Sequence, residues 1–385
     1  MDTTIMDKAA QTRSASAAVL SMALCVAVLI ASEFLPVSLL TPIAQDLGVS
    51  EGAAGQAISI SGLFAVITSL TIARLTRGID RKRVQSGLTA LLTVSALIVT
   101  VAPDYQVLMI GRALLGVAIG GFWSMSTAIV MRLLPPQSVP QGLAALNAGN
   151  AIAATIAAPL GSWLGDIIGW RGAFFFIVPL ALLALPAEMR QKASNPFRLL
   201  AQGQVALGMA AMFLLFMGQF ALFTYLRPFI ESVAGFTVPQ LSLSLLLIGL
   251  AGIAGTWLIS RLLRRHLFAL LIGIPLVMAG LAGLLLILWQ TPAAVVGLLF
   301  LWGVFATAAP VGWGTWLART MGDDAEAGGG LQVATIQLAI MSGAAVGGLM
   351  FDAFGWQANF GMAALLLLGA SIAASLTWKN LKAAQ

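Results

Sequence analysis

The sequence predicts an all-α polytopic membrane protein with twelve transmembrane helices in two pseudo-symmetric bundles of six. Hydrophobic residues make up 59% of the 385 residues and charged residues only 9%, whereas ordinary soluble domains carry roughly 25% charged residues. So few charges cannot cover the surface of a soluble protein of this size. We therefore expect lipid to be the main solvent of the chain, and a sequence repeat to divide it into halves.

Twelve apolar stretches have the length that a helix needs to cross a bilayer core of about 30 Å. Lipid offers no partner to unpaired backbone groups, and alternating strands of about ten residues are absent, so we expect every span to be a helix. The predicted spans are residues 18–41, 54–76, 85–102, 106–133, 141–164, 171–189, 204–228, 239–262, 267–289, 292–317, 329–351 and 357–378.

The chain repeats itself at an offset of 186 residues. Gly161, Asp166, Gly169, Trp170 and Phe174 recur as Gly347, Asp352, Gly355, Trp356 and Phe360, Phe34 and Pro42 recur as Phe220 and Pro228, and Gln219 stands opposite Glu33. We therefore predict an N-terminal bundle over 1–190, a cytoplasmic linker over 191–203 and a C-terminal bundle over 204–385. Secondary transporters use duplicated halves of this kind and rock them around a central site.

The distribution of basic residues predicts the orientation. If the N-terminus is inside, 17 of the 20 Lys and Arg residues fall in cytoplasmic segments, which is the positive-inside bias. Both termini are therefore expected in the cytoplasm. The net charge of +6 is spread over alternate loops as membrane anchors, so we expect no nucleic-acid partner.

Metal, cofactor and enzyme chemistry find little support in the sequence. Cys25 is the only cysteine and His266 the only histidine, so neither a disulfide nor a thiol cluster for a metal is possible. No Gly-Lys dipeptide exists for a phosphate-binding loop, and no His-Glu-x-x-His motif or nucleophile elbow with a suitable histidine occurs. We expect no cofactor, no metal and no enzyme activity, and therefore an ion gradient as the energy source.

Glu33 and Arg112 are the two ionisable side chains well inside the predicted spans. A charge at the helix centre costs about 2.5–3.5 kcal/mol on insertion scales, so it normally faces a partner or a water-filled cavity. Both residues fall in the outer half of the membrane, at depths that permit a pair. We hypothesise that Glu33 carries a proton and that Arg112 modulates it. The alternative is a permanent buried pair that only fixes two helices.

Amide and aromatic side chains supply candidates for solute binding. Gln219 replaces Glu33 in the second half and cannot titrate, so it resembles a solute-binding amide. Aromatic faces with amides suit a planar, uncharged, hydrogen-bonding solute, and packing or interfacial anchoring is the alternative for each aromatic. The candidates are Gln219, Phe223, Tyr225, Trp123, Asn150, Trp313, Gln332 and Gln337.

Small residues at intervals of four predict close helix packing. Arg112, Gly116 and Gly120 share one face of the fourth span, and Pro159 and Gly161 follow a similar stripe in the fifth. Small residues let a neighbouring helix approach closely. The stripes indicate tight packing, seams that slide during transport, or both.

Several motifs resemble the major facilitator superfamily and its drug:proton antiporter branch, with bacterial purine ribonucleoside efflux pumps and sugar efflux transporters as similar members. The motifs are residues 33–42, 120–125, 218–220, 224–228 and 310–313, together with Arg112-x-x-x-Gly116 and Pro159-x-Gly161. In the loop after the second span the acidic residue is displaced to Asp80, beside Arg81. In the fifth span Ala154 and Ala158 stand where the antiporter motif has glycines.

The resemblance implies alternating-access export of inosine- or guanosine-like solutes in exchange for protons across the bacterial inner membrane. It assigns the proton-coupling roles to Glu33 and Arg112 and conformational roles to Asp80, Arg81, Gly116, Pro159 and Gly161. The expected partners are the solute, protons and the bilayer, and we expect a monomer. The alternatives are sugar or drug efflux, an importer of the same fold, and a membrane receptor or structural protein that moves no solute.

Overall fold

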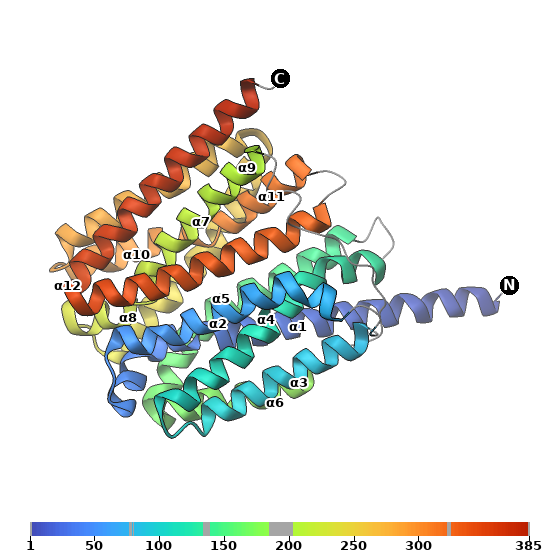
Figure 1. The fold of residues 1–385 in the computed structure, drawn as a ribbon, viewed down its shortest axis with the longest axis horizontal. Helices are drawn as coiled ribbons and strands as arrows, with labels where there is room; N and C mark the ends of the chain where they lie inside the picture. Colours follow the sequence, from blue (N-terminus) through green and yellow to red (C-terminus); the bar gives the residue numbers. More distant parts are fainter. Residues whose placement is uncertain are drawn as a thin grey trace.

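The computed structural model of the protein describes residues 2–76, 79, 81–133, 139–184, 203–321 and 325–383, and its secondary structure there is helical. Figure 1 shows two groups of helices side by side, the first half of the chain in blue to green and the second half in yellow to red. Long helices of this kind present their apolar side chains both to one another and outward, as expected in lipid.

The first half begins with a helix that is continuous through the first span. A glycine with positive φ, Gly48 (φ 64), follows this helix, and Ser50 caps the next one by accepting a hydrogen bond from the Ala53 amide at 3.0 Å. The helices are α1 (Asp2–Leu47), α2 (Glu51–Leu75), α3 (Arg81–Thr100), α4 (Tyr105–Leu133), α5 (Val139–Phe175) and α6 (Ile177–Leu183).

The second half has the same general order but is more interrupted. Its seventh span breaks after Phe223 and continues as a short helix and one π-helical turn. The elements are α7 (Gly203–Phe223), α8 (Leu226–Pro228), η3 (Phe229–Val233), α9 (Val238–Leu288), α10 (Pro292–Ala306), α11 (Ala309–Met321) and α12 (Ala325–Ala383). Except for Gly203, the predicted linker 191–203 lies outside the described residues.

The described helices are compatible with twelve crossings of a membrane. In the described part of the chain, ten stretches are long and apolar enough to span a membrane. Two of them, Ala148–Leu183 with 36 residues and Leu331–Asn380 with 50, would extend about 54 and 75 Å if straight. Each is broken by a glycine of positive φ, Gly169 or Gly355, and Figure 1 shows α12 doubling back on itself. Each of the two stretches is therefore long enough to cross twice.

Each half has its own apolar core. One cluster of buried side chains comes from residues 22–184, with Tyr225 as its only member from the second half. The other comes from residues 205–374, with Val37, Ile58 and Ala158 from the first half. The residues shared between clusters identify where the bundles pack against each other.

Candidate functional site

Arg112 is buried where α1, α2 and α4 meet. It is 0% exposed and Glu33 is 2% exposed. The guanidinium group donates hydrogen bonds to the carbonyl oxygens of Ala57 (3.0 Å), Ser32 (2.7 Å) and Glu33 (3.2 Å) and to Ser61 Oγ (3.2 Å). Arg112 therefore contacts the main chain of Glu33, and within the described residues the two side chains form no direct ion pair.

The Glu33 carboxyl group instead reaches the second half of the protein. The side chain of Gln337 in α12 lies close enough to this carboxyl group to interact with it. Glu33 Oε1 and Gln337 Oε1 are both buried and have no hydrogen-bond partner among the residues that the structure describes. Buried acceptors normally have partners. These two oxygens can therefore receive a proton or a hydrogen bond from a solute without breaking an existing bond.

Phe34 and Phe220 mark the pseudo-symmetry axis between the halves. They are equivalent positions of the sequence repeat, and their rings stack with centroids 5.6 Å apart and an interplanar angle of 16°. Phe223 packs edge-on against both rings. Gln219 precedes Phe220 as Glu33 precedes Phe34, and its Oε1 is also buried without a partner. Three free acceptor oxygens therefore belong to residues near the contact between α1, α7 and α12.

The remaining solute-binding candidates have different surroundings. Asn150 on α5 and Gln332 on α12 are half-buried. Trp123 is also half-buried and packs edge-on against Phe122 at 6.4 Å. Trp313 lies in the core of the second half, so its ring faces protein in this conformation.

Tyr225 lies in a contact between the halves. It is fully buried, its hydroxyl donates to the Ala344 carbonyl oxygen at 2.7 Å, and its ring stacks on Phe351 at 5.3 Å. The hydroxyl is also 3.5 Å from the carbonyl oxygen of Gly52 in the first half. In this conformation the side chain is occupied by protein contacts and offers no free surface to a solute.

Asp352 closes the same end of the molecule, where α1 ends and α2 begins. Its carboxylate accepts hydrogen bonds from Ser50 Oγ and, at 3.0 Å, from the Gly52 amide at the N-terminus of α2. A negative charge is favourable at a helix N-terminus. We call Ser50, Gly52, Tyr225 and Asp352 the outer seal, because the predicted orientation places this end outside.

The small-residue stripes coincide with close helix approaches. A Cβ atom added to Gly116 would lie 2.1 Å from the Ser61 carbonyl oxygen, and one added to Gly120 would lie 2.2 Å from that of Ala65. Glycine therefore lets α4 lie directly against α2. In α5, a Cβ at Gly161 would meet Ser38 Oγ of α1 at 2.6 Å, and Pro159 is half-buried within the helix.

Two charged residues of the contact between halves were missed by the sequence analysis. Arg227 stands at the end of the predicted span 204–228; it is buried, pairs with Glu231 at 2.8 Å and donates to the Ser38 carbonyl oxygen of the first half. The sequence analysis assigned no role to this residue. The i,i+4 spacing between Arg227 and Glu231 was the sequence feature that could have predicted this ion pair.

Asp352 was noticed only as a member of the repeat, and nothing local in the sequence indicates its partners across the interface. Asp80 lies outside the described residues. Arg81 begins α3, but its side chain lies outside the described part.

These features define the class of the protein. Two pseudo-symmetric six-helix bundles that meet around a buried carboxyl group are the architecture of a secondary transporter. The model of the Major Facilitator Superfamily matches residues 22–331, and the chain belongs to this superfamily.

Several curated relatives cover nearly the whole chain. It is 45% identical over 372 residues to the purine ribonucleoside efflux pump NepI of Escherichia coli (strain K12), with 94% of this chain and 92% of the pump aligned. It is 45% identical over 368 residues to NepI of Shigella sonnei, with 93% of each chain aligned. It is also 53% identical over 376 residues to the transcription regulatory protein OpdE of Pseudomonas aeruginosa, with 94% of each chain aligned.

Solved structures share the fold. A bacterial homologue of the human lysosomal transporter Spinster, in an inward-facing and occupied conformation, superimposes with a TM-score of 0.74 at 15% identity, covering 95% of this chain and 97% of that one. The human organic anion transporter MFSD10 gives a TM-score of 0.65 at 20% identity, covering 94% of this chain and 99% of that one.

Proposed function

We propose that the chain exports purine ribonucleosides of the inosine and guanosine kind in exchange for protons, by alternating access. The observation that carries the proposal is the proximity of the Glu33 carboxyl group of the first half to the Gln337 side chain of the second. A change of protonation at Glu33 alters a contact that joins the two halves. Proton binding and the rocking of the halves are thereby linked at one carboxyl group.

The free acceptors support a nucleoside as the solute. Glu33, Gln219 and Gln337 each hold a buried oxygen without a partner, and a purine ribonucleoside brings ring N–H and ribose hydroxyl donors. The aromatic faces of Phe223 and Trp123 suit the planar base. The two NepI relatives are named as purine ribonucleoside efflux pumps, which favours the nucleoside over a sugar.

One proton per cycle supplies enough free energy for export. A proton that enters down a membrane potential of about 100 mV releases about 2.3 kcal/mol, and one pH unit adds about 1.4 kcal/mol. Their sum sustains a solute ratio of several hundredfold, at about tenfold per 1.4 kcal/mol. A single coupling carboxyl group is therefore sufficient.

The outer seal supports an inward-open state of the cycle. With both termini in the cytoplasm of a bacterium, the contacts of Asp352 and Tyr225 close the outer end, and the solute enters from the cytoplasmic side. We propose that the chain is a monomer in the inner membrane. We also propose that Asp80 and Arg81 lie at its cytoplasmic face.

A second candidate function is regulation without transport, favoured by the relative named as a transcription regulatory protein. In that case the chain acts as a membrane receptor, and ligand binding at Glu33 changes the arrangement of the halves without moving solute. Residues inside the bilayer cannot contact DNA, so any regulation by them would be indirect. Transport measurements separate the two functions.

The test is counterflow in liposomes that contain the purified full-length chain. We expect labelled inosine and guanosine to move against their gradient when a pH gradient is imposed, and to stop when a protonophore collapses it. Protein-free liposomes are the control. If only sugars move, the protein is a sugar exporter. If solute moves independently of the pH gradient, it is a facilitator. If no solute in the panel moves, the receptor function is favoured.

A further inference from the structure

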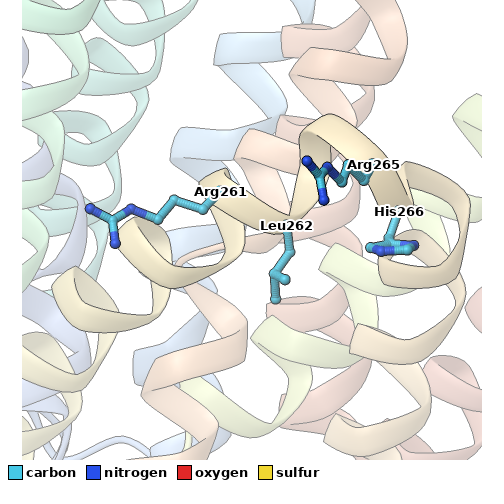
Figure 2. Close-up of a pocket in the computed structure, with 4 residues that line it drawn as sticks. All are labelled: Arg261, Leu262, Arg265 and His266. Carbon is cyan, nitrogen blue, oxygen red and sulfur yellow. The ribbon is translucent and has the colours of Figure 1, made fainter.

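A basic hollow of about 470 Å³ opens at the bend of α9, outside the solute site. It is lined by Arg261, Leu262, Arg265 and His266. His266 has φ −130 and ψ 39 and lies at the start of the stretch Arg265–Leu288, directly after the stretch Val238–Leu263. Figure 2 shows Arg261 and Arg265 extending to the same side of the helix, with Leu262 between them. The hollow therefore presents two fixed positive charges at one end of a span.

The position of Arg261 is fixed by an aromatic neighbour. Its guanidinium carbon lies 3.6 Å from the centroid of the Trp257 ring, a geometry in which cation–π attraction is strong. Arg261 and Arg265 are exposed, and neither is in an ion pair with the residues that the structure describes. A planar guanidinium with several donors suits phosphate oxygens, so the hollow fits a ligand with an anionic phosphate.

An apolar strip continues from the hollow along the membrane-facing side of α9. Ile253, Trp257, Leu258 and Leu262 are exposed there, Trp257 at 59%. Residues three and four apart share one helix face, so the strip and the two arginines lie along a single line. A free phosphate would contact only the arginines. A ligand that contacts the whole line has a phosphate at one end and a hydrocarbon chain at the other.

We propose that the basic hollow and the apolar strip bind an anionic phospholipid, with its phosphate between Arg261 and Arg265 and an acyl chain along Trp257 and Leu258. Counting crossings from the N-terminus puts the hollow on the same membrane face as both termini, the predicted cytoplasmic face. A lipid bound at His266 holds the bend between two spans of the second half. The site is separate from the solute site and does not depend on the transported solute.

The test is lipid retention by the full-length protein, measured by native mass spectrometry with phosphatidylglycerol, phosphatidylethanolamine and inorganic phosphate as probes. We expect the wild type to retain phosphatidylglycerol in preference to phosphatidylethanolamine. The double variant Arg261→Gln/Arg265→Gln should bind phosphatidylglycerol roughly tenfold more weakly. The matched control Arg74→Gln/Arg83→Gln removes two exposed arginines on the same predicted face and should change binding less than about twofold.

Two further variants keep the test independent of folding defects. Arg261→Lys/Arg265→Lys retains the charge and should keep most of the binding, whereas Trp257→Leu retains both arginines and should weaken it severalfold. Equal losses in the two glutamine pairs would show general surface attraction and overturn the proposal. Inorganic phosphate that binds alone and displaces the lipid would show a free-anion site and would overturn it as well.

Discussion

At the scale of single residues, Arg112 acts on the main chain of its neighbours. Its guanidinium group binds three carbonyl oxygens, from Ala57 on α2 and from Ser32 and Glu33 on α1, and the Ser61 hydroxyl. Arg112 therefore fixes the position of α1 at the point where Glu33 leaves it. The Glu33 carboxyl group is left to contact the second half, which is the arrangement that a coupling residue needs.

The Glu33→Gln variant should lose pH-gradient-driven counterflow. Glutamine cannot titrate, yet its amide has nearly the shape of the carboxyl group and can still interact with Gln337, so we expect the protein to insert and to exchange solute downhill. Transport in liposomes with and without a pH gradient measures this. The matched control is Asp166→Asn at an exposed position, which should transport within about twofold of the wild type. Full gradient dependence in Glu33→Gln would exclude Glu33 as the proton carrier.

The Arg112→Lys variant should be destabilised although it keeps the charge. An ammonium group has three donors and lacks the planar fork of guanidinium, so at least one buried acceptor around Arg112 loses its partner. An unsatisfied buried acceptor costs about 1–3 kcal/mol. We expect a lower melting temperature in detergent than for Arg83→Lys, an exposed control. Equal melting temperatures would show that position 112 needs only a positive charge.

At the scale of elements, glycine determines how closely the helices approach. Gly116 and Gly120 bring α4 against α2, and in the second half Gly303 of α10 would place a Cβ 2.2 Å from the Ile248 carbonyl oxygen of α9. The same kind of contact therefore joins the fourth and second spans and the tenth and eighth. The repeat is preserved in the packing as well as in the sequence.

Gly116→Ala should therefore separate α4 from α2 and lower stability. The added methyl group meets a main-chain carbonyl at 2.1 Å, and forced expansion of a packed contact costs about 1–3 kcal/mol. Gly87→Ala in α3 is the matched control, because nothing lies within 4 Å of its Cβ and alanine favours a helix by about 0.5–1 kcal/mol. The melting temperature should fall for Gly116→Ala and rise for Gly87→Ala. A stable Gly116→Ala protein would mean that α4 can shift freely along α2.

The length of apolar runs was enough to predict the helices and the two halves, because both depend on local composition and on the repeat. The choice between a straight helix and a reversal was visible in the sequence at Gly169 and Gly355, which match each other. Contacts across the interface were not predictable, because they depend on the tilt of whole bundles. Gln337 was therefore expected to bind solute but lies beside Glu33, and Tyr225 was expected to bind solute but lies in the outer seal.

At the scale of the whole molecule, the two halves are not used symmetrically. Asp166 and Asp352 are equivalent in the repeat, but Asp352 reaches the N-terminus of α2 in the other half. The equivalent helix of the second half, α9, is capped by its own Thr237 and Gln240. The carboxylate of Asp352 therefore adds a contact between the halves to those of Tyr225 and Arg227, and its removal should shift the equilibrium between closed and open outer ends.

Asp352→Ala should increase the population in which the outer end is open. The variant loses two hydrogen bonds to α2, and because Asp352 is exposed we expect a shift of only about fivefold, or about 1 kcal/mol. Val101→Cys and Ile287→Cys in a Cys25→Ser background place spin labels on exposed outer ends of the two halves, and distance measurements report the populations. Asp166→Ala is the control and should leave the distances unchanged. If both aspartate variants behave alike, the carboxylate at the N-terminus of α2 does not hold the outer end closed, and the seal rests on the packing of Tyr225 instead.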